Sequence, residues 1–283
     1  MIYAHLQKGD GMSTPRPWLR SQVRWLQKAL NADGAGLKAD GFFGNATDKA
    51  LRAFQRAHSL TEDGSAHAET RRILIEVLRG KMGLALQMVS NLMPGFRGDP
   101  DFVHLLEGHQ GKPYWPGGES GVTLDPGVDL GQLELQRVRG LFGTKLSHPQ
   151  WLAVEGVLGL RGEAARDALA ADLVLQGIRI SHKDADEMLI FALRPYWQGI
   201  SSRFSALTGE TVPPVVQTVL LSLAYNRGHG NAGLEPLAEP LAQADWRGLA
   251  QRVGAMQQDH QLEGIRTRRR QEAALILDSL EPA

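Results

Sequence analysis

Apolar residues at three- and four-residue spacing predict three short helices in the first eighty positions. The run 21–30 places Val23 and Leu26 on one helical face, and the runs 46–60 and 69–78 follow the same spacing. A turn-rich stretch, "NADGAGLKADG", separates the first two runs. The pattern therefore predicts a small three-helix unit at the start of the chain.

Beyond Asp101 the pattern is again mostly helical. Runs with apolar residues at helical spacing cover residues 149–160, 162–176, 183–197, 215–226 and 247–258. The stretch 105–132 is different, because it holds many glycines and short β-like pieces. One small sheet in a field of helices predicts a mainly α, α+β fold.

The chain of 283 residues is long enough for two domains that each bury a core. Residues 79–92 can form a linking helix, and "MPGFRGDP" after it has the composition of a boundary. We therefore expect a first domain over residues 1–80, a linker helix over 81–100 and a second domain over 101–283.

The composition, 42% hydrophobic and 22% charged, is that of an ordinary globular protein. The sequence has no cysteine, which excludes disulfides and thiolate metal sites. Its first residues lack the apolar core of a secretory signal, and no apolar run of 18 residues follows. We expect synthesis in the cytoplasm, no membrane insertion, and release or delivery by another factor if the protein acts outside.

Charge is unevenly distributed along the chain. Residues 1–98 carry 14 Lys+Arg against 8 Asp+Glu, and the remainder carries 17 against 23. A basic first third favours an anionic polymer as partner, although a solvated helical surface gives the same composition.

Two segments of the first eighty residues are an imperfect repeat, "DGFFGNAT" (40–47) and "DGSAHAET" (63–70). In each, Asp-Gly predicts a tight turn, and a later polar residue caps the next helix. With Leu26-Gln27 and Phe54-Gln55, the segment 18–78 resembles the peptidoglycan-binding domain of cell-wall hydrolases and phage endolysins. His67 departs from the pattern, which usually has glycine there. The resemblance implies peptidoglycan as the partner, and nothing in the sequence indicates nucleic acid.

Three polar residues in the glycine-rich stretch are candidates for catalysis. Glu107 ends a short predicted helix capped by Asp99 or Asp101, and the helix dipole disfavours a charged carboxylate there. Thr123 and Asp129 each stand between apolar neighbours, and the "DPG" between them predicts a turn that brings them together. A cleft with a proton donor, a second carboxylate and a hydroxyl suits glycoside hydrolysis.

This stretch also resembles the phage-type lysozymes, most closely the pesticin-like branch, whose Glu, Thr and Asp match Glu107, Thr123 and Asp129. "LSLAYNRG" (221–228) and "GIRTRRRQEAALIL" (264–277) are similar to two later helices of that family. The resemblance implies a monomeric N-acetylmuramidase that cleaves the β-1,4 bond between N-acetylmuramic acid and N-acetylglucosamine. It implies no metal and no cofactor.

Two residues, Asp129 and Glu119, are candidates for the second catalytic carboxylate. Commoner phage lysozymes carry it before the Thr, where Glu119 stands, whereas Asp129 follows the Thr. We favour Asp129, because Glu119 lies at a predicted loop tip. Tyr114 and Trp115 can stack on a sugar or pack the loop, and Asn226 can contact substrate or tie its helix to the hairpin.

Other functions remain to be distinguished. His104, Glu107 and His109 suggest a zinc amidase, although their spacing is not a recognised ligand set. A lytic transglycosylase also uses a helix-borne Glu, and a non-catalytic wall-binding protein would need none. A phage endolysin and a secretion-delivered lysozyme effector or bacteriocin are both consistent with the sequence.

Overall fold

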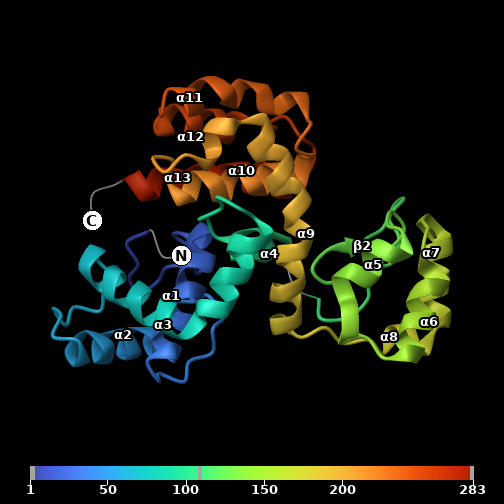
Figure 1. Cartoon of the computed structure of the whole chain (residues 1–283), viewed down its shortest axis with the longest axis horizontal. Helices are drawn as coiled ribbons and strands as arrows, with labels where there is room; N and C mark the ends of the chain where they lie inside the picture. Colours follow the sequence, from blue (N-terminus) through green and yellow to red (C-terminus); the bar gives the residue numbers. More distant parts are fainter. Residues whose placement is uncertain (1–3, 108–109, 281–283) are drawn as a thin grey trace. The chain divides into compact units, whose positions relative to one another are not determined.

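The structure, a computed structural model, describes residues 4–107 and 110–280 (Figure 1). Contacts within the chain divide it into two units. The first unit consists of Met1–Val103 and Arg194–Ala283, and the second of His104–Leu193. The first domain expected from the sequence, residues 1–80, therefore belongs to the same unit as the end of the chain.

The three helices expected at the start of the chain are confirmed. They are α1 (Arg20–Ala32), α2 (Asn45–Ala57) and α3 (Ala68–Leu92), preceded by the 3-10 turn η1 (Pro17–Leu19). Helix α1 packs on both α2 and α3. Because α3 continues to Leu92, the third predicted helix and much of the predicted linker are one element.

A buried glutamine holds each Asp-Gly turn of the sequence repeat. The side chain of Gln27 accepts the Gly41 N–H at 2.8 Å and donates to Asp40 Oδ1 at 3.1 Å. Gln55 makes the corresponding bonds to Gly64 N and Asp63 Oδ1, both at 2.9 Å. Both glycines have positive φ, 82° and 72°, which a residue with a Cβ rarely adopts. The repeat is therefore a repeated structural unit.

The rest of the first unit is a group of helices. It contains η3 (Ser205–Thr208), α10 (Pro214–Arg227), η4 (Ala232–Leu237), α11 (Ala238–Ala242), α12 (Trp246–Ala255) and α13 (Glu263–Leu280). Helix α13 packs against α12, α10 and η1, and every residue of α10 from Val215 to Ala224 is buried. We call this group the C-terminal helices (Figure 1).

Asp99 and Asp101, at the start of α4 (Pro100–Glu107), connect this segment to α1, and Asp99 also connects it to the C-terminal helices. Asp99, fully buried, accepts hydrogen bonds from Trp25 Nε1 at 2.7 Å and Gln22 Nε2 at 3.0 Å. Its own N–H donates to Thr218 Oγ1 on α10 at 2.8 Å. Asp101 pairs with Lys28 Nζ at 2.7 Å. Buried polar bonds of this kind fix α1 to the segment that leads into α4.

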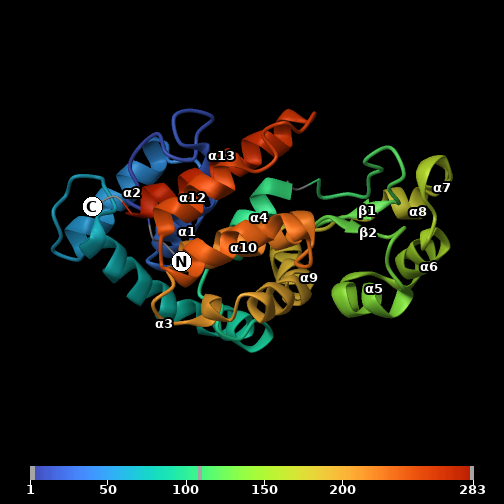
Figure 2. The ribbon, with the colours of Figure 1, turned by 90° about the horizontal axis from the view of Figure 1, so that it is seen from above.

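The second unit holds the hairpin and a set of short helices. Strands β1 (Thr123–Leu124) and β2 (Val128–Asp129) pair antiparallel, as Figure 2 shows. The helices are α5 (Leu135–Phe142), η2 (Gly143–Lys145), α6 (His148–Val157), α7 (Gly162–Ala171), α8 (Leu173–Gln176) and the first part of α9 (His182–Arg203). Their shared core includes Leu124, Leu130, Phe142, Val154 and Ile178.

The helix predictions for the second part of the chain need one correction. The run 162–176 is two helices, α7 and α8, because Asp172 is extended and its side chain accepts the Leu175 N–H at 2.9 Å. Helices α5 and α11 were not predicted. In the described part of the chain, no helix has both the length and the apolar composition to span a bilayer.

Candidate active site

The hairpin brings Thr123 and Asp129 together, as the sequence predicts. Thr123 and Asp129 are direct partners in the β1–β2 register, with Leu124 opposite Val128. Tyr114 extends the ladder on the other side of Thr123, through backbone bonds of 3.0 and 2.8 Å. Directly opposed residues of an antiparallel pair lie on the same face of the sheet, so the two side chains are neighbours.

Two backbone N–H groups orient the carboxylate of Asp129. Its Oδ1 accepts from Gly121 N at 3.0 Å and from Gly131 N at 2.8 Å. Its Oδ2 accepts from the exposed Gln132 side chain at 2.8 Å. Glycine is required at both positions, because a Cβ on Gly121 would lie 2.3 Å from Gly131 N and a Cβ on Gly131 would lie 2.6 Å from the Leu160 carbonyl oxygen. Gly121 and Gly131 thus serve to hold the carboxylate.

Thr123 is more enclosed than an open cleft would require. Its side chain is only 3% exposed, and its hydroxyl donates to the Gly121 carbonyl at 3.4 Å. Both neighbours, Val122 and Leu124, are fully buried. The hydroxyl is therefore buried, with the Gly121 carbonyl as its acceptor.

Glu107 is the last residue of α4 and is exposed. Of the two caps considered for this helix, Asp99 is the one used, because its Oδ1 accepts the Asp101 N–H at 3.0 Å. The predicted short helix ending in a carboxylate is confirmed.

Tyr114 connects Glu107 electrostatically with the hairpin. Burial raises the pKa of the Tyr114 phenol above its usual value, and the negative charges of Asp125, Glu107 and Asp129 raise it further. The three carboxylates therefore act on one phenol, which stays protonated at neutral pH and is available as a donor.

Asp125, in the hairpin turn, has a role that sequence reasoning missed. It is 1% exposed, and its carboxylate accepts the N–H of Gln110 at 3.2 Å and the N–H of Gly111. These bonds tie the turn to the chain just after α4. The sequence marks this residue only as the Asp of "DPG", a pattern that predicts a turn.

The other expected loop residues lie at the edge of this site. Glu119 is exposed at a loop tip, beside Gly162 at the start of α7. Trp115 donates from Nε1 to the Ser120 carbonyl at 3.0 Å and packs on the core of the second unit. Trp115 thus packs its own loop, and its stacking on a sugar stays a prediction.

Asn226 belongs to the first unit, in a buried polar network. Its Oδ1 accepts from Arg269 Nη2 at 3.0 Å. Arg268 and Arg269 both pair with Glu272, and all three side chains are buried. Burial raises the pKa of Glu272, against the opposing effect of the two guanidinium groups. Arg268 and Arg269 therefore pack inside the protein.

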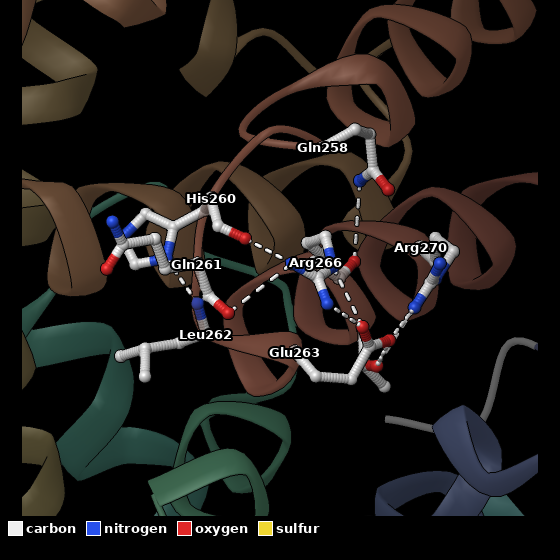
Figure 3. A network of polar contacts seen from close by, with 8 residues as sticks. Gln258, His260, Gln261, Leu262, Glu263, Arg266 and Arg270 are labelled. Atoms are coloured by element: carbon white, nitrogen blue, oxygen red, sulfur yellow. Dashed lines mark hydrogen bonds and ion pairs between the residues drawn. The ribbon is translucent and has the colours of Figure 1, made fainter.

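Arg270 points instead into an exposed network at the start of α13 (Figure 3). Glu263 accepts hydrogen bonds from Arg266, Arg270 and Thr267, which lowers the pKa of its carboxyl. Arg266 also donates to the carbonyl of His260. A carboxylate in the first turn of a helix is favourably placed, so this network stabilises the start of α13.

The residues considered for zinc are used differently. His104 Nδ1 lies 2.8 Å from Asp186 Oδ1 of α9, and the His104 side chain is 2% exposed. His109 lies outside the described residues. Within residues 4–107 and 110–280, no group of three or more potential ligands is placed to hold a metal ion.

Comparison with known proteins identifies two regions of the chain. Residues 20–74 match the family model of a peptidoglycan binding domain. Residues 98–247 match the pesticin model, described as the bacterial toxin homologue of phage lysozyme, C-terminal. None of the curated proteins matches. A crystal structure of a Burkholderia AP3 phage endolysin is similar at 19% identity over 96% of this chain and 98% of that one, with a TM-score of 0.22.

Proposed function

Because the chain belongs to the pesticin family of phage-lysozyme homologues, we propose that Glu107, Asp129 and Thr123 carry out its hydrolysis of peptidoglycan. The chain is a cell-wall hydrolase of the lysozyme type, joined to a peptidoglycan binding domain. Its reaction is cleavage of the β-1,4 bond between N-acetylmuramic acid and N-acetylglucosamine. The observation that supports these three residues is the Thr123–Asp129 pair beside Tyr114, whose phenol also responds to the charge of Glu107.

In the proposed reaction Glu107 is the general acid. Its proton goes to the glycosidic oxygen as the bond from that oxygen to the sugar carbon breaks. A water attacks the same carbon from the opposite face, and Asp129 takes the proton that the water loses. Thr123 holds this water together with Asp129. Where the Glu107 and Asp129 carboxyl groups are far enough apart to admit this water, the outcome is inversion at the sugar carbon.

Asp129 is favoured over Glu119 as the second carboxylate because of its neighbours. Asp129 is oriented by two backbone N–H groups and stands opposite Thr123, whereas Glu119 is exposed at a loop tip. A carboxylate that is preorganised by hydrogen bonds contributes more to catalysis than one without them. Tyr114 would donate a hydrogen bond to substrate, and Trp115 and Glu119 would bind parts of the glycan strand.

Three neutral variants test the assignment. Glu107→Gln and Asp129→Asn should each lower the rate of reducing-end release from peptidoglycan by about a hundredfold or more. Glu119→Gln should lower it only modestly. If Glu119→Gln and Asp129→Asn exchange these results, Glu119 is the second carboxylate.

The peptidoglycan binding domain concentrates the enzyme on an insoluble polymer. A monomer that acts on the cell wall after release from the cytoplasm would serve a phage as an endolysin. The same enzyme would serve a bacterium as a delivered toxin, as the pesticin description suggests. Lysis of the producing cell only when a membrane-permeabilising protein is co-expressed supports the endolysin role, whereas killing of neighbouring cells supports the toxin role.

A further inference from the structure

We propose that Asp125 and the His104–Asp186 pair form a clamp that positions Glu107 from both sides. The inference rests on the proposed function, because it assigns positioning residues to the Glu107 acid. The three residues do not touch the reacting atoms. They hold the backbone on either side of Glu107, and all of them lie in the second unit.

Glu107 needs such support because of where it stands. Helix α4 has eight residues, and a helix this short is marginal without tertiary contacts. Glu107 is its last residue, and its side chain is exposed. A catalytic group that moves by about 1 Å can lose about a hundredfold in rate. Bonds that hold the backbone next to Glu107 therefore contribute to its rate.

The first half of the clamp is on the helix. His104 lies three residues before Glu107, so the two side chains are on the same side of α4. The buried His104 ring pairs with Asp186 at 2.8 Å. On either side of Asp186 in α9, Asp184 and Glu187 both pair with Lys145 at 2.7 Å.

The second half of the clamp is after the helix. The Asp125 carboxylate accepts the N–H groups of Gln110 and Gly111, three and four residues beyond Glu107. The Gly111 carbonyl also accepts the Ile180 N–H at 3.0 Å, just before α9. Since Asp125 is in the turn between Thr123 and Asp129, its bonds tie the chain that follows α4 to the hairpin that would hold the water.

The buried carboxylate of Asp125 is suited to this task. An ionised carboxylate accepts two N–H donors at once, whereas an asparagine of the same size accepts with one oxygen and turns an N–H toward the second donor. Asp125→Asn therefore removes one anchor at nearly constant volume. At position 104, His→Leu removes the bond to Asp186, and His→Asn keeps an N–H in the place of Nδ1.

The test compares full-length variants on soluble, uncross-linked peptidoglycan strands, with kcat and KM from reducing-end release and Tm from circular dichroism. The control is Asp172→Asn, which alters the same kind of bond at the start of α8. Asp125→Asn and His104→Leu should lower kcat about tenfold or more with KM unchanged. Asp172→Asn should leave kcat unchanged, and His104→Asn should restore most of it.

The outcomes separate the clamp from the catalytic assignment. The clamp is wrong if Asp125→Asn or His104→Leu has the same kcat as the Asp172→Asn control. It is also wrong if the variant loses kcat/KM through a higher KM and not through a lower kcat. If Asp125→Asn does not fold, Asp186→Asn, on a partly exposed side chain, gives the same comparison for the helix side. If Glu107→Gln keeps wild-type kcat, the role of Glu107 fails instead.

Discussion

The indole of Trp25 donates a 2.7 Å hydrogen bond to the carboxylate of Asp99, and both side chains are buried. Trp25 is on α1 of the peptidoglycan binding domain, and Asp99 precedes α4, which the pesticin match includes. A second contact, from Trp18 Nε1 to Asp278 Oδ2 at 2.5 Å, joins η1 to α13. The binding domain is thus packed on the C-terminal helices, and is not an independent anchor on a tether.

The first prediction is that the binding domain and the C-terminal helices unfold together. Trp25→Phe leaves Asp99 buried with one donor fewer, at an expected cost of about 2 kcal/mol. Amide hydrogen exchange should show the same loss of protection in α1 and in α10. Arg56→Ala, which breaks an exposed ion pair with Glu62, is the control and should change neither. A loss confined to α1 would contradict the prediction.

This junction changes how wall binding is measured. Deleting residues 1–80 removes the donors to Asp99 and exposes the face of the C-terminal helices, so the shortened chain loses stability as well as wall affinity. Loss of activity after that deletion therefore does not isolate binding. Surface variants of the domain isolate wall binding, because their activity can be compared on intact sacculi and on soluble strands.

The second prediction contrasts two glutamates of α13. Glu272 is fully buried between Arg268 and Arg269, and Glu263 is exposed among Arg266 and Arg270. Glu272→Gln leaves two buried guanidinium groups without a counter-charge and should cost about 3 to 5 kcal/mol. Glu263→Gln should leave the denaturation midpoint close to that of the wild type. Urea unfolding measures both, and equal midpoints would show that the buried pairing is not required.

The third prediction concerns acid stability and Asp63. Burial raises the pKa of Asp63, but the N–H of Ser65 and the side chains of His67 and Gln55 outweigh it and hold the pKa at about 2. Because this folded-state value is below the unfolded one, the charged form stabilises the fold above about pH 4, and the contribution is lost as the pH falls toward 2. Solvent limits it to about 1 kcal/mol. Between pH 4 and 2, Asp63→Asn should lose less stability than the wild type; parallel curves would refute this.

Local patterns of the sequence predict many of the helices and turns of the fold. Helical spacing placed α1, α2 and α10, and the Asp-Gly repeat marked both turns, because these features depend on neighbouring residues. The repeat did not reveal that Gln27 and Gln55 close the turns, since each bond spans several residues of intervening chain. Helix α11 was missed because it has only five residues, too few for periodicity to register.

The candidate site was predictable to the same extent. The hairpin partners Thr123 and Asp129 follow from alternation around a turn. The role of Asp125, and the pairing of His104 with Asp186 82 positions later, depend on tertiary contacts that no local pattern contains. His67, which departs from the family pattern, is accommodated because its backbone is extended (φ −67°, ψ 176°) and needs no glycine.

The central claim, a muramidase with Glu107 as its acid, is tested most directly by mass spectrometry of digested sacculi. Wild-type protein should release fragments with reducing N-acetylmuramic acid ends and intact peptides, and Glu107→Gln at the same concentration should release none. Anhydro-muramic ends would indicate a transglycosylase, and cut peptides an amidase or peptidase. Either product, or reducing ends released by Glu107→Gln at the wild-type rate, would contradict the account.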